Sequence, residues 1–250
     1  MPAPQARILL VDDDPALRRF AQMALEDMPL DLITCDRVST AVQVLQEGPV
    51  QIIVTDLMMP GESGLGLLQR LKEQPALRGQ ARVVVLSAGL TPARREELVH
   101  MDVWCLLDKP VSVVQLMACI NEGLAPASPT KPPATAAPEP LPANAARAHA
   151  QAAIEEYFAG DGALYRAYRV TCLTQFVHDV HNGDTAAAAH DLVSLRHLAH
   201  NAKSVLRMLG YPALSTQAHC LEEDCTRGRS AEALAGWQAL RTAVLAIGNP

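Results

Sequence analysis

The chain has 250 residues, of which 49% are hydrophobic and 19% are charged. This length suits two domains of ordinary size, and the composition excludes a disordered tail or a collagen-like polymer. The 21 basic and 27 acidic residues give a formal net charge of −6, and the aromatic residues number only two Trp, four Tyr and three Phe. We therefore expect no extended nucleic-acid surface, which needs positive charge and stacking side chains.

No uncharged apolar stretch reaches the roughly 18 to 20 residues that cross a bilayer, and the first residues lack the apolar core of a secretory signal. These features predict a cytoplasmic protein that does not enter the membrane. The six cysteines include no CxxC pair, so we interpret them as free thiols rather than a disulfide framework.

In the first 124 residues, short β-branched or aliphatic runs alternate with segments of helical period, such as Leu17, Phe20 and Ala24. This alternation predicts a parallel sheet in an α/β domain. Runs that are apolar on both faces suit strands covered by helices on each side, as in an open doubly wound fold. The predicted strands are residues 7–11, 31–35, 51–55, 82–86 and 104–107.

The segment after this region is rich in proline. Residues 125–142 hold seven of the 18 prolines, so they can neither keep a helix nor supply a central strand. We expect a semi-extended linker over residues 125–144 that tethers two domains.

Beyond the linker, apolar residues repeat only at helical spacing, which predicts an all-α helical bundle over residues 145–248, with four helices at its centre. One helix carries an apolar seam whose spacings alternate between three and four, as expected where it packs against antiparallel neighbours. The seam is Leu192, Leu195, Ala199, Ala202, Leu206 and Leu209. The predicted helices are residues 146–159, 162–182, 185–209, 212–226 and 230–247.

Polar residues follow the predicted strands where a parallel sheet binds its ligands. Asp12 and Asp13 follow the first strand, Asp56 ends the third, Ser87 follows the fourth and Lys109 the fifth. Carboxylates gathered at one edge repel one another unless a hard cation such as Mg²⁺ binds them, and a carboxylate can act as a nucleophile that forms an acyl phosphate. The lysine and serine would contact phosphoryl oxygens. The pattern predicts a metal-assisted phosphoryl site.

Each of these residues alone has a simpler explanation, because Asp and Ser are common turn formers and an exposed Lys usually only solvates the surface. Their joint placement at four strand ends favours the phosphoryl site. Asp14 is assigned to a different role, since an Asp followed by Pro15 is typical of a helix N-cap with proline at the first helical position.

Four segments together resemble the receiver domain of bacterial response regulators over residues 5–124. They are ILLVDDDP, VTDLMMPGESG, VVLSAG and LLDKP. The resemblance implies a flavodoxin-like fold with strand order 2-1-3-4-5 and phosphorylation of Asp56. It implies Mg²⁺ (or Mn²⁺) bound by Asp13, Asp56 and the backbone carbonyl of Met58, with Asp12 assisting through water.

The same resemblance implies a cis peptide bond between Lys109 and Pro110, which an X-Pro bond permits. One position departs from the family pattern: Leu106 stands where Tyr or Phe is usual, so the family's aromatic switch is not expected in its ordinary form. Phosphoryl chemistry should survive this change, because a leucine contacts no charge.

In the second half, Arg196, His200, Lys203 and Arg207 follow at spacings of four, three and four, so they share one helix face. We call this set the basic stripe. Its cations would attract phosphoryl oxygens, and the small Ser204 would let a partner approach.

The segment LAHNAKSVLRMLG resembles the signature of histidine-containing phosphotransfer (HPt) domains, and HCLEED at residues 219–224 resembles the next helix of that family. The resemblance implies that His200 is phosphorylated on its ring, with Lys203, Ser204 and Gly210 at the other motif positions. Two other interpretations stay open: an ordinary surface histidine, or a zinc site built from His197 and His200 with His219 or Cys220.

The combination predicts a two-component phosphorelay protein that exchanges a phosphoryl group between Asp56 and His200, within or between chains. Its expected partners are a sensor histidine kinase and the receiver domain of another response regulator. The alternative is a phosphorylation-controlled interaction module whose bundle docks a partner without carrying phosphate. Neither half has an ATP-binding glycine loop, so we expect no kinase activity of its own, and no direct DNA binding because no recognition-helix unit remains.

Overall fold

The computed structural model describes residues 5–90, 92–125 and 145–248. The chain separates into two compact units, Met1–Leu141 and Pro142–Pro250. Of the predicted linker, residues 126–144 lie outside the described residues, so its borders stay a prediction.

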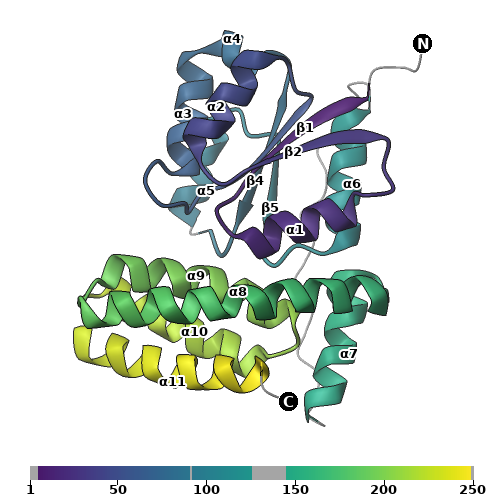
Figure 1. Cartoon of the computed structure of the whole chain (residues 1–250). Helices are drawn as coiled ribbons and strands as arrows, with labels where there is room; N and C mark the ends of the chain where they lie inside the picture. Colours follow the sequence, from purple (N-terminus) through teal and green to yellow (C-terminus); the bar gives the residue numbers. More distant parts are fainter. Residues whose placement is uncertain (1–4, 91, 126–144, 249–250) are drawn as a thin grey trace. The chain divides into compact units, whose positions relative to one another are not determined.

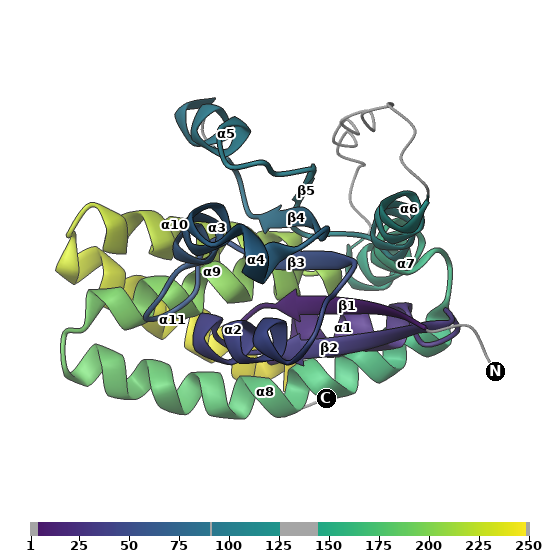
Figure 2. The same cartoon turned by 90° about the horizontal axis from the view of Figure 1, so that it is seen from above.

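The first unit contains a five-stranded parallel sheet in the order β2-β1-β3-β4-β5 (Figure 2). Every expected strand is present, with ends shifted by one residue at most, and the strand order expected of a flavodoxin-like fold is confirmed. Parallel pairing places the carboxyl ends of all five strands at one edge of the sheet. The strands are β1 (Ala6–Val11), β2 (Leu30–Cys35), β3 (Ile52–Asp56), β4 (Arg82–Ser87) and β5 (Cys105–Asp108).

Helices cover both faces of this sheet (Figure 1). One face joins Leu9, Ile53 and Val85 of the strands to buried residues of α2, α3 and α5 in a single apolar cluster. Helices α1 and α6 pack against each other over the opposite face. The helices are α1 (Pro15–Ala24), α2 (Val38–Glu47), α3 (Gly64–Glu73), α4 (Pro75–Arg78), α5 (Pro92–Val99) and α6 (Val113–Leu124).

Local side-chain contacts set the starts of the helices that border the strand ends. Asp14 is the N-cap of α1: its Oδ1 accepts the Ala16 N–H at 2.8 Å, and Pro15 is the first helical residue, as predicted. At α6, Ser112 and Gln115 form a reciprocal capping box. Between β5 and α6, the Lys109-Pro110 peptide bond is cis, as the family resemblance implied.

The second unit is all-α, and its bundle consists of α8 to α11 packed against their neighbours (Figure 1). Helix α7 packs against α8 and α9. It also contacts the turn between α9 and α10, where Gly210 lies close to the backbone of His149 and Ala150. The helices are α7 (Ala145–Phe158), α8 (Gly162–Ala188), α9 (Leu192–Met208), α10 (Pro212–Thr226) and α11 (Ser230–Gly248).

The predicted break between the second and third of these helices, at residues 183 and 184, is wrong. Helix α8 continues through Gly183 to Ala188, and α9 begins after the N-cap Asp191. Gly183 is needed for packing: a Cβ there would lie 2.0 Å from Cζ2 of Trp237. The glycine admits an aromatic ring from α11 rather than ending a helix.

Candidate functional site

Three aspartates meet at the carboxyl edge of the sheet. Asp12 follows β1 and Asp56 ends β3, and both are fully buried. One ligand atom from each of Asp12, Asp13 and Asp56 lies within 4.8 Å of the others. The structure thus brings together the carboxylates that the strand ends predicted.

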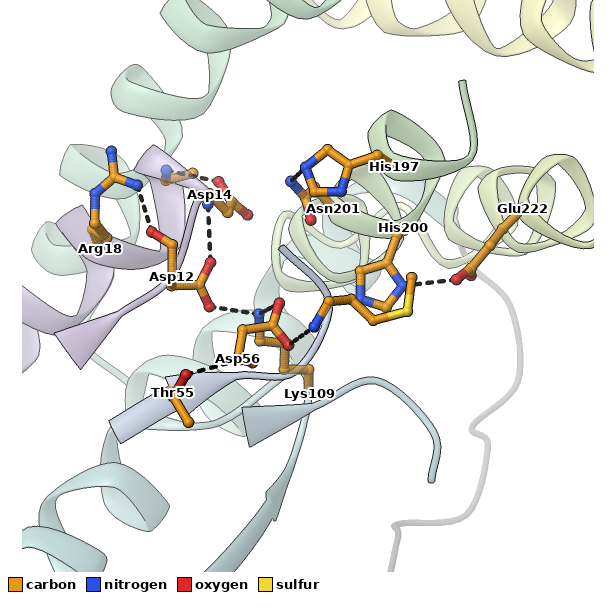
Figure 3. A network of polar contacts seen from close by, with 12 residues as sticks. Asp12, Asp14, Arg18, Thr55, Asp56, Lys109, His197, His200, Asn201 and Glu222 are labelled. Carbon is orange, nitrogen blue, oxygen red and sulfur yellow. Dashed lines mark hydrogen bonds and ion pairs between the residues drawn. The ribbon is translucent and has the colours of Figure 1, made fainter. Parts of the chain in front are cut away.

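Lys109 lies between two of these carboxylates (Figure 3). Its Nζ donates to Asp12 Oδ2 at 2.6 Å and to Asp56 Oδ2 at 2.9 Å, and its side chain is only 4% exposed. The backbone N–H of Lys109 donates to the carbonyl of Ser87 at 2.8 Å, which fixes the loop after β5 against the end of β4. Ser87 itself is buried at that strand end, and its predicted contact with a phosphoryl oxygen stays a prediction.

The charges in this cluster depend on one another. Burial lowers the pKa of Lys109, but the negative charges of Asp12 and Asp56 outweigh it, so the net shift is upward and the ammonium form is kept. Burial raises the pKa of Asp12 to about 7, with the Lys109 charge opposing and the Asp56 charge reinforcing the shift. A single lysine does not fully compensate three carboxylates, which is the environment that attracts a further cation.

The carboxylate of Asp56 is positioned from several sides. The Met58 N–H donates to its Oδ1 at 3.2 Å, while Lys109 holds its Oδ2. The hydroxyl of Thr55 donates to the Asp56 carbonyl at 2.9 Å. A Cβ on Gly64 would lie 1.8 Å from that carbonyl oxygen, so the start of α3 can approach β3 only with glycine. Backbone packing therefore fixes the position of the Asp56 carboxylate.

Asp12 is held by the turn that starts α1. The Asp14 N–H donates to Asp12 Oδ1 at 2.9 Å, and Arg18 Nη1 donates to the Asp12 carbonyl at 2.5 Å (Figure 3). Asp14 thus caps the helix with its side chain and orients Asp12 with its backbone. The capping role assigned from the sequence accounts for only one of these contacts.

The aspartate cluster has the donors that a hard divalent cation prefers. Carboxylate oxygens from two strand ends converge, and Mg²⁺ usually takes only one or two carboxylates together with water and phosphate oxygens. Asp12, Asp13 and Asp56 would hold such an ion, which would supply positive charge to phosphoryl oxygens.

In the second unit, Glu222 of α10 reaches back to α9 (Figure 3). Its Oε1 lies 2.7 Å from His200 Nδ1, and its Oε2 accepts a hydrogen bond from Lys203 Nζ at 2.7 Å. A carboxylate only accepts hydrogen bonds, so Nδ1 carries the proton and the lone pair of a neutral ring is on Nε2. His200 is buried, and its Nε2 has no hydrogen-bond partner in the described part of the chain.

The helix-face argument missed Glu222, which contacts both His200 and Lys203. Burial alone would raise its pKa, but the hydrogen bonds from His200 and Lys203 lower it from 4.5 to about 2. The sequence offered one signal for this residue, the resemblance of HCLEED to the helix that follows the histidine helix in HPt domains. That resemblance did not single out Glu222.

Two cations of the basic stripe have partners on other helices, which the spacing along the sequence did not predict. Lys203 is paired with Glu222, and Arg207 Nε donates to the Tyr157 hydroxyl of α7 at 3.1 Å. Ser204, one turn after His200, is buried, and its predicted role in admitting a partner stays a prediction. The carboxylate nearest to His200 comes from another helix, which spacing along α9 cannot reveal.

The alternative zinc site is not assembled. Nδ1 of His200 is bonded to Glu222, and His219 is 55% exposed and contacts Glu222 and Glu223. Among the described residues, the aspartate cluster is the one set of three ligand-type side chains that gathers closely enough for a metal. Leu106 packs partly buried against the apolar cluster of the first unit, where the family usually has an aromatic ring.

The doubly wound domain with its aspartate cluster, followed by a helical bundle that carries His200, is the arrangement expected of the phosphoryl-accepting modules of two-component signalling. Comparison with known families agrees with both halves. Residues 8–121 match the response regulator receiver domain, and residues 168–249 match the Hpt domain. The chain contains both domains, the combination found in a two-component phosphorelay. None of the described helices is long and apolar enough to span a membrane.

Known relatives resemble this chain over part of their length. The DNA-binding transcriptional regulator NtrC of Azospirillum brasilense is 31% identical over 146 residues, which cover 58% of this chain and 28% of that protein. Sensor protein GacS of Pseudomonas syringae pv. syringae is 30% identical over 112 residues, or 44% of this chain and 12% of that protein. The chain thus spans less than a third of either relative. A solved signal receiver domain of a putative Luxo repressor protein from Vibrio parahaemolyticus aligns with a TM-score of 0.46 and 22% identity, covering 48% of this chain and 91% of that one.

Proposed function

We propose that this protein is a phosphorelay intermediate that holds a phosphoryl group as an acyl phosphate on Asp56 and as a phosphohistidine on His200. The observation that carries the proposal is the Lys109 ammonium bound between Asp12 and Asp56. This arrangement places a positive charge beside a nucleophilic carboxylate, as phosphoryl transfer requires.

At Asp56, a carboxylate oxygen would attack the phosphorus of a donor phosphohistidine, forming a P–O bond as the P–N bond breaks. Lys109 would then contact an oxygen of the transferred group, and the Ser87 hydroxyl would donate to another. A divalent cation held by Asp12, Asp13 and Asp56, with the carbonyl of Met58 as a further ligand, would neutralise charge on the phosphoryl oxygens.

At His200, Nε2 would be the attacking atom, because Nδ1 is engaged by Glu222. Attack on an acyl phosphate transfers the phosphoryl group to nitrogen and releases the carboxylate. Glu222 keeps the proton on Nδ1 and orients the ring, while Lys203 supplies a nearby cation for the transferred oxygens.

The expected partners are a sensor histidine kinase, which would charge Asp56, and a receiver domain, which would exchange with His200. A cytoplasmic location and the absence of kinase activity, both expected from the sequence, belong to the proposal. NtrC is named a transcriptional regulator and GacS a sensor protein. This chain aligns with 28% of the first and 12% of the second, so the activities in those names are not transferred to it.

The test uses the stability of the phosphoryl bond. The full chain, Asp56→Asn and His200→Gln are each labelled with a radioactive small phosphodonor and with a phosphorylated receiver. We expect the small phosphodonor to give His200→Gln an acid-stable, base-labile label, and the phosphorylated receiver to give Asp56→Asn an acid-labile, base-stable label.

A bundle that only docks a partner, the alternative function, would give no acid-labile label on any variant. Equal loss of label in both variants would contradict two separate acceptors. His219→Gln is the matched control, since that exposed histidine should not affect either label.

A further inference from the structure

A cation of α1 contacts the backbone at the edge of the aspartate cluster. Nη1 of Arg18 donates to the carbonyl oxygen of Asp12 at 2.5 Å, and the arginine is partly buried (Figure 3). Side chains of an α-helix tilt towards its N-terminus, so Arg18 reaches back over the first turn of α1 to the end of β1. This contact therefore joins the helix to the strand end that carries candidate metal ligands.

The carbonyl of Asp12 lies where the pairing of β1 ends. The register of β1 with β2 and β3 runs as far as Val11, and the Asp12 N–H makes one further bond, to the Cys35 carbonyl at 3.0 Å. Asp12 is fully buried, so water does not reach its carbonyl oxygen. A buried carbonyl without a donor costs free energy, and Arg18 supplies a charged donor in place of a neighbouring strand.

The direction of this carbonyl fixes the peptide unit that joins two of the three candidate metal ligands. A peptide unit is planar, so the direction of the Asp12 carbonyl also sets the direction in which the backbone enters Asp13. The Asp12 side chain is held separately, by the Asp14 N–H. Arg18 therefore acts on the backbone that carries both carboxylates.

We propose that Arg18 is a positioning residue for the divalent cation. It holds the Asp12–Asp13 peptide unit in the orientation in which Asp12, Asp13 and Asp56 can share one ion. The inference rests on the proposed function, since it concerns the cation site beside the phosphoacceptor. Groups that orient metal ligands contribute about tenfold or more to the affinity for the metal.

The charge of Arg18 opposes this effect. A guanidinium near the cluster repels a second cation, so charge alone predicts that its removal strengthens Mg²⁺ binding. Loss of the hydrogen bond predicts the reverse, because the buried carbonyl would turn towards another donor and carry the carboxylates with it. The direction of the change in affinity therefore separates positioning from electrostatics.

The experiment titrates the unphosphorylated full chain with MgCl₂ alone in a calorimeter. Arg18→Gln removes the charge and is too short to reach the Asp12 carbonyl, and we expect it to raise the Kd for Mg²⁺ about tenfold. Arg19→Gln is the matched control, because it removes the same charge from the adjacent, exposed position of α1. The control should leave Kd unchanged or lower it slightly.

Arg18→Lys keeps the charge and a donor but lacks the planar fork, so it should raise Kd by a smaller factor than Arg18→Gln. Because affinity for the cation is lost and not the chemistry, a high Mg²⁺ concentration should restore the rate at which a small phosphodonor labels Asp56 in Arg18→Gln. Urea unfolding shows whether each variant folds, and the two variants provide independent measurements of Kd.

The proposal is overturned if a folded Arg18 variant binds Mg²⁺ as tightly as the unsubstituted chain or more tightly, or if labelling stays slow at saturating Mg²⁺. An unsubstituted chain that binds no Mg²⁺ overturns it as well. The binding measurement needs no phosphodonor, so the two proposals fail separately. If Asp56 takes no label while Arg18→Gln weakens Mg²⁺ binding, the proposed function fails and the role of Arg18 stands.

Discussion

Glu222 is one carboxylate that binds two groups of another helix, His200 and Lys203. Its side chain is 15% exposed, so the contacts are only partly screened by water. Two such contacts hold α10 against α9 at the level of the candidate phosphoacceptor. The stability of the bundle and the orientation of the imidazole therefore depend on the same residue.

Replacing Glu222 by Gln should make the stability of the bundle less dependent on pH. The pKa of Glu222 is lowered from 4.5 to about 2 in the folded state, so its contribution is complete above pH 4.5 and is lost as the pH falls towards 2. We expect Glu222→Gln to lower the free energy of unfolding at pH 7 by on the order of 2 kcal/mol, and the difference from the unsubstituted protein to shrink below pH 4.5. Urea unfolding followed by circular dichroism, at several pH values, measures this difference in the free energy of unfolding.

Glu223→Gln is the matched control, because this neighbouring carboxylate is more exposed and pairs with Arg227, the C-cap residue of the same helix. It should change the stability by about 0.5 kcal/mol or less. A loss in Glu222→Gln that stays constant from pH 7 to pH 2 would show that the ionised carboxylate is not its source.

The two candidate sites differ in how far the sequence predicts them. Asp12, Asp56 and Lys109 could be placed together in advance, because a parallel sheet brings the ends of its strands to one edge. Glu222 could not, because periodicity tells which residues share a face of one helix and not which residue of another helix faces them. The same limit explains why the pairing of Lys203 with Glu222 was not predicted.

At the scale of elements, two glycines let helices approach their neighbours. Gly64 opens α3 beside the backbone of Asp56, and Gly183 lies in α8 beneath the indole of Trp237. Both act through the absence of a side chain rather than through an unusual backbone angle. Sequence patterns located the helices but attributed the second glycine to a helix end, since glycine is also a common breaker.

Gly64→Ala should disturb the phosphoacceptor itself. The new methyl group would lie 1.8 Å from the Asp56 carbonyl oxygen, and a backbone atom cannot rotate away. We expect a loss of about 2 kcal/mol in the stability of the receiver half and slower labelling of Asp56 by a small phosphodonor. Chemical unfolding and the initial labelling rate are the two measurements.

Gly66→Ala provides the comparison two residues along the same helix, where the new Cβ would meet only the flexible Glu62 side chain at 3.0 Å. It should be tolerated, and a helical alanine is favoured over glycine by up to about 1 kcal/mol. Equal labelling rates in Gly64→Ala and Gly66→Ala would contradict the role given to Gly64.

Gly183→Ala should separate α8 from α11. The methyl group would overlap the Trp237 ring, whose Nε1 donates to Asp184 at 3.0 Å, so both the packing and this hydrogen bond would be lost. We expect the bundle to lose about 2 kcal/mol of stability, measured by urea unfolding.

The control for Gly183→Ala is Gly236→Ala in α11, where the nearest atom to the new Cβ is Leu221 Cδ1 at an ordinary 3.6 Å. That variant should be neutral or more stable, because alanine favours the helix. Destabilisation of both variants by the same amount would indicate a general intolerance of the bundle and not a specific contact with Trp237.

At the scale of the whole molecule, the proposed relay uses two unlike acceptors for the phosphoryl group, a carboxylate in the first half and a ring nitrogen in the second. The first gathers carboxylates that need a cation, and the second presents a ring nitrogen beside a Glu–Lys pair. An acyl phosphate is a high-energy donor and a histidine can accept from it. Chelation of divalent cations should therefore block the charging of Asp56 while leaving the contacts of His200 unchanged.

The relay predicts that label moves from one half to the other. The full chain is charged at Asp56 with a radioactive small phosphodonor and Mg²⁺, the donor is removed, and base-labile and base-stable label are followed in time. Base-labile label should fall as base-stable label rises, His200→Gln should retain only the base-labile form, and chelation before charging should prevent both.

Mixing His200→Gln that is radioactively phosphorylated on Asp56 with unlabelled Asp56→Asn then distinguishes transfer between chains from transfer within one chain. Label that reaches His200 of the second protein passes between chains, whereas transfer seen only in the unsubstituted protein passes within one chain. If Asp56→Asn alone gains base-stable label from the small donor as fast as the unsubstituted protein does, His200 is charged without Asp56. In that case Asp56 and His200 are phosphorylated independently of each other. Transfer from Asp56 to His200 requires that Asp56 carries the phosphoryl group first.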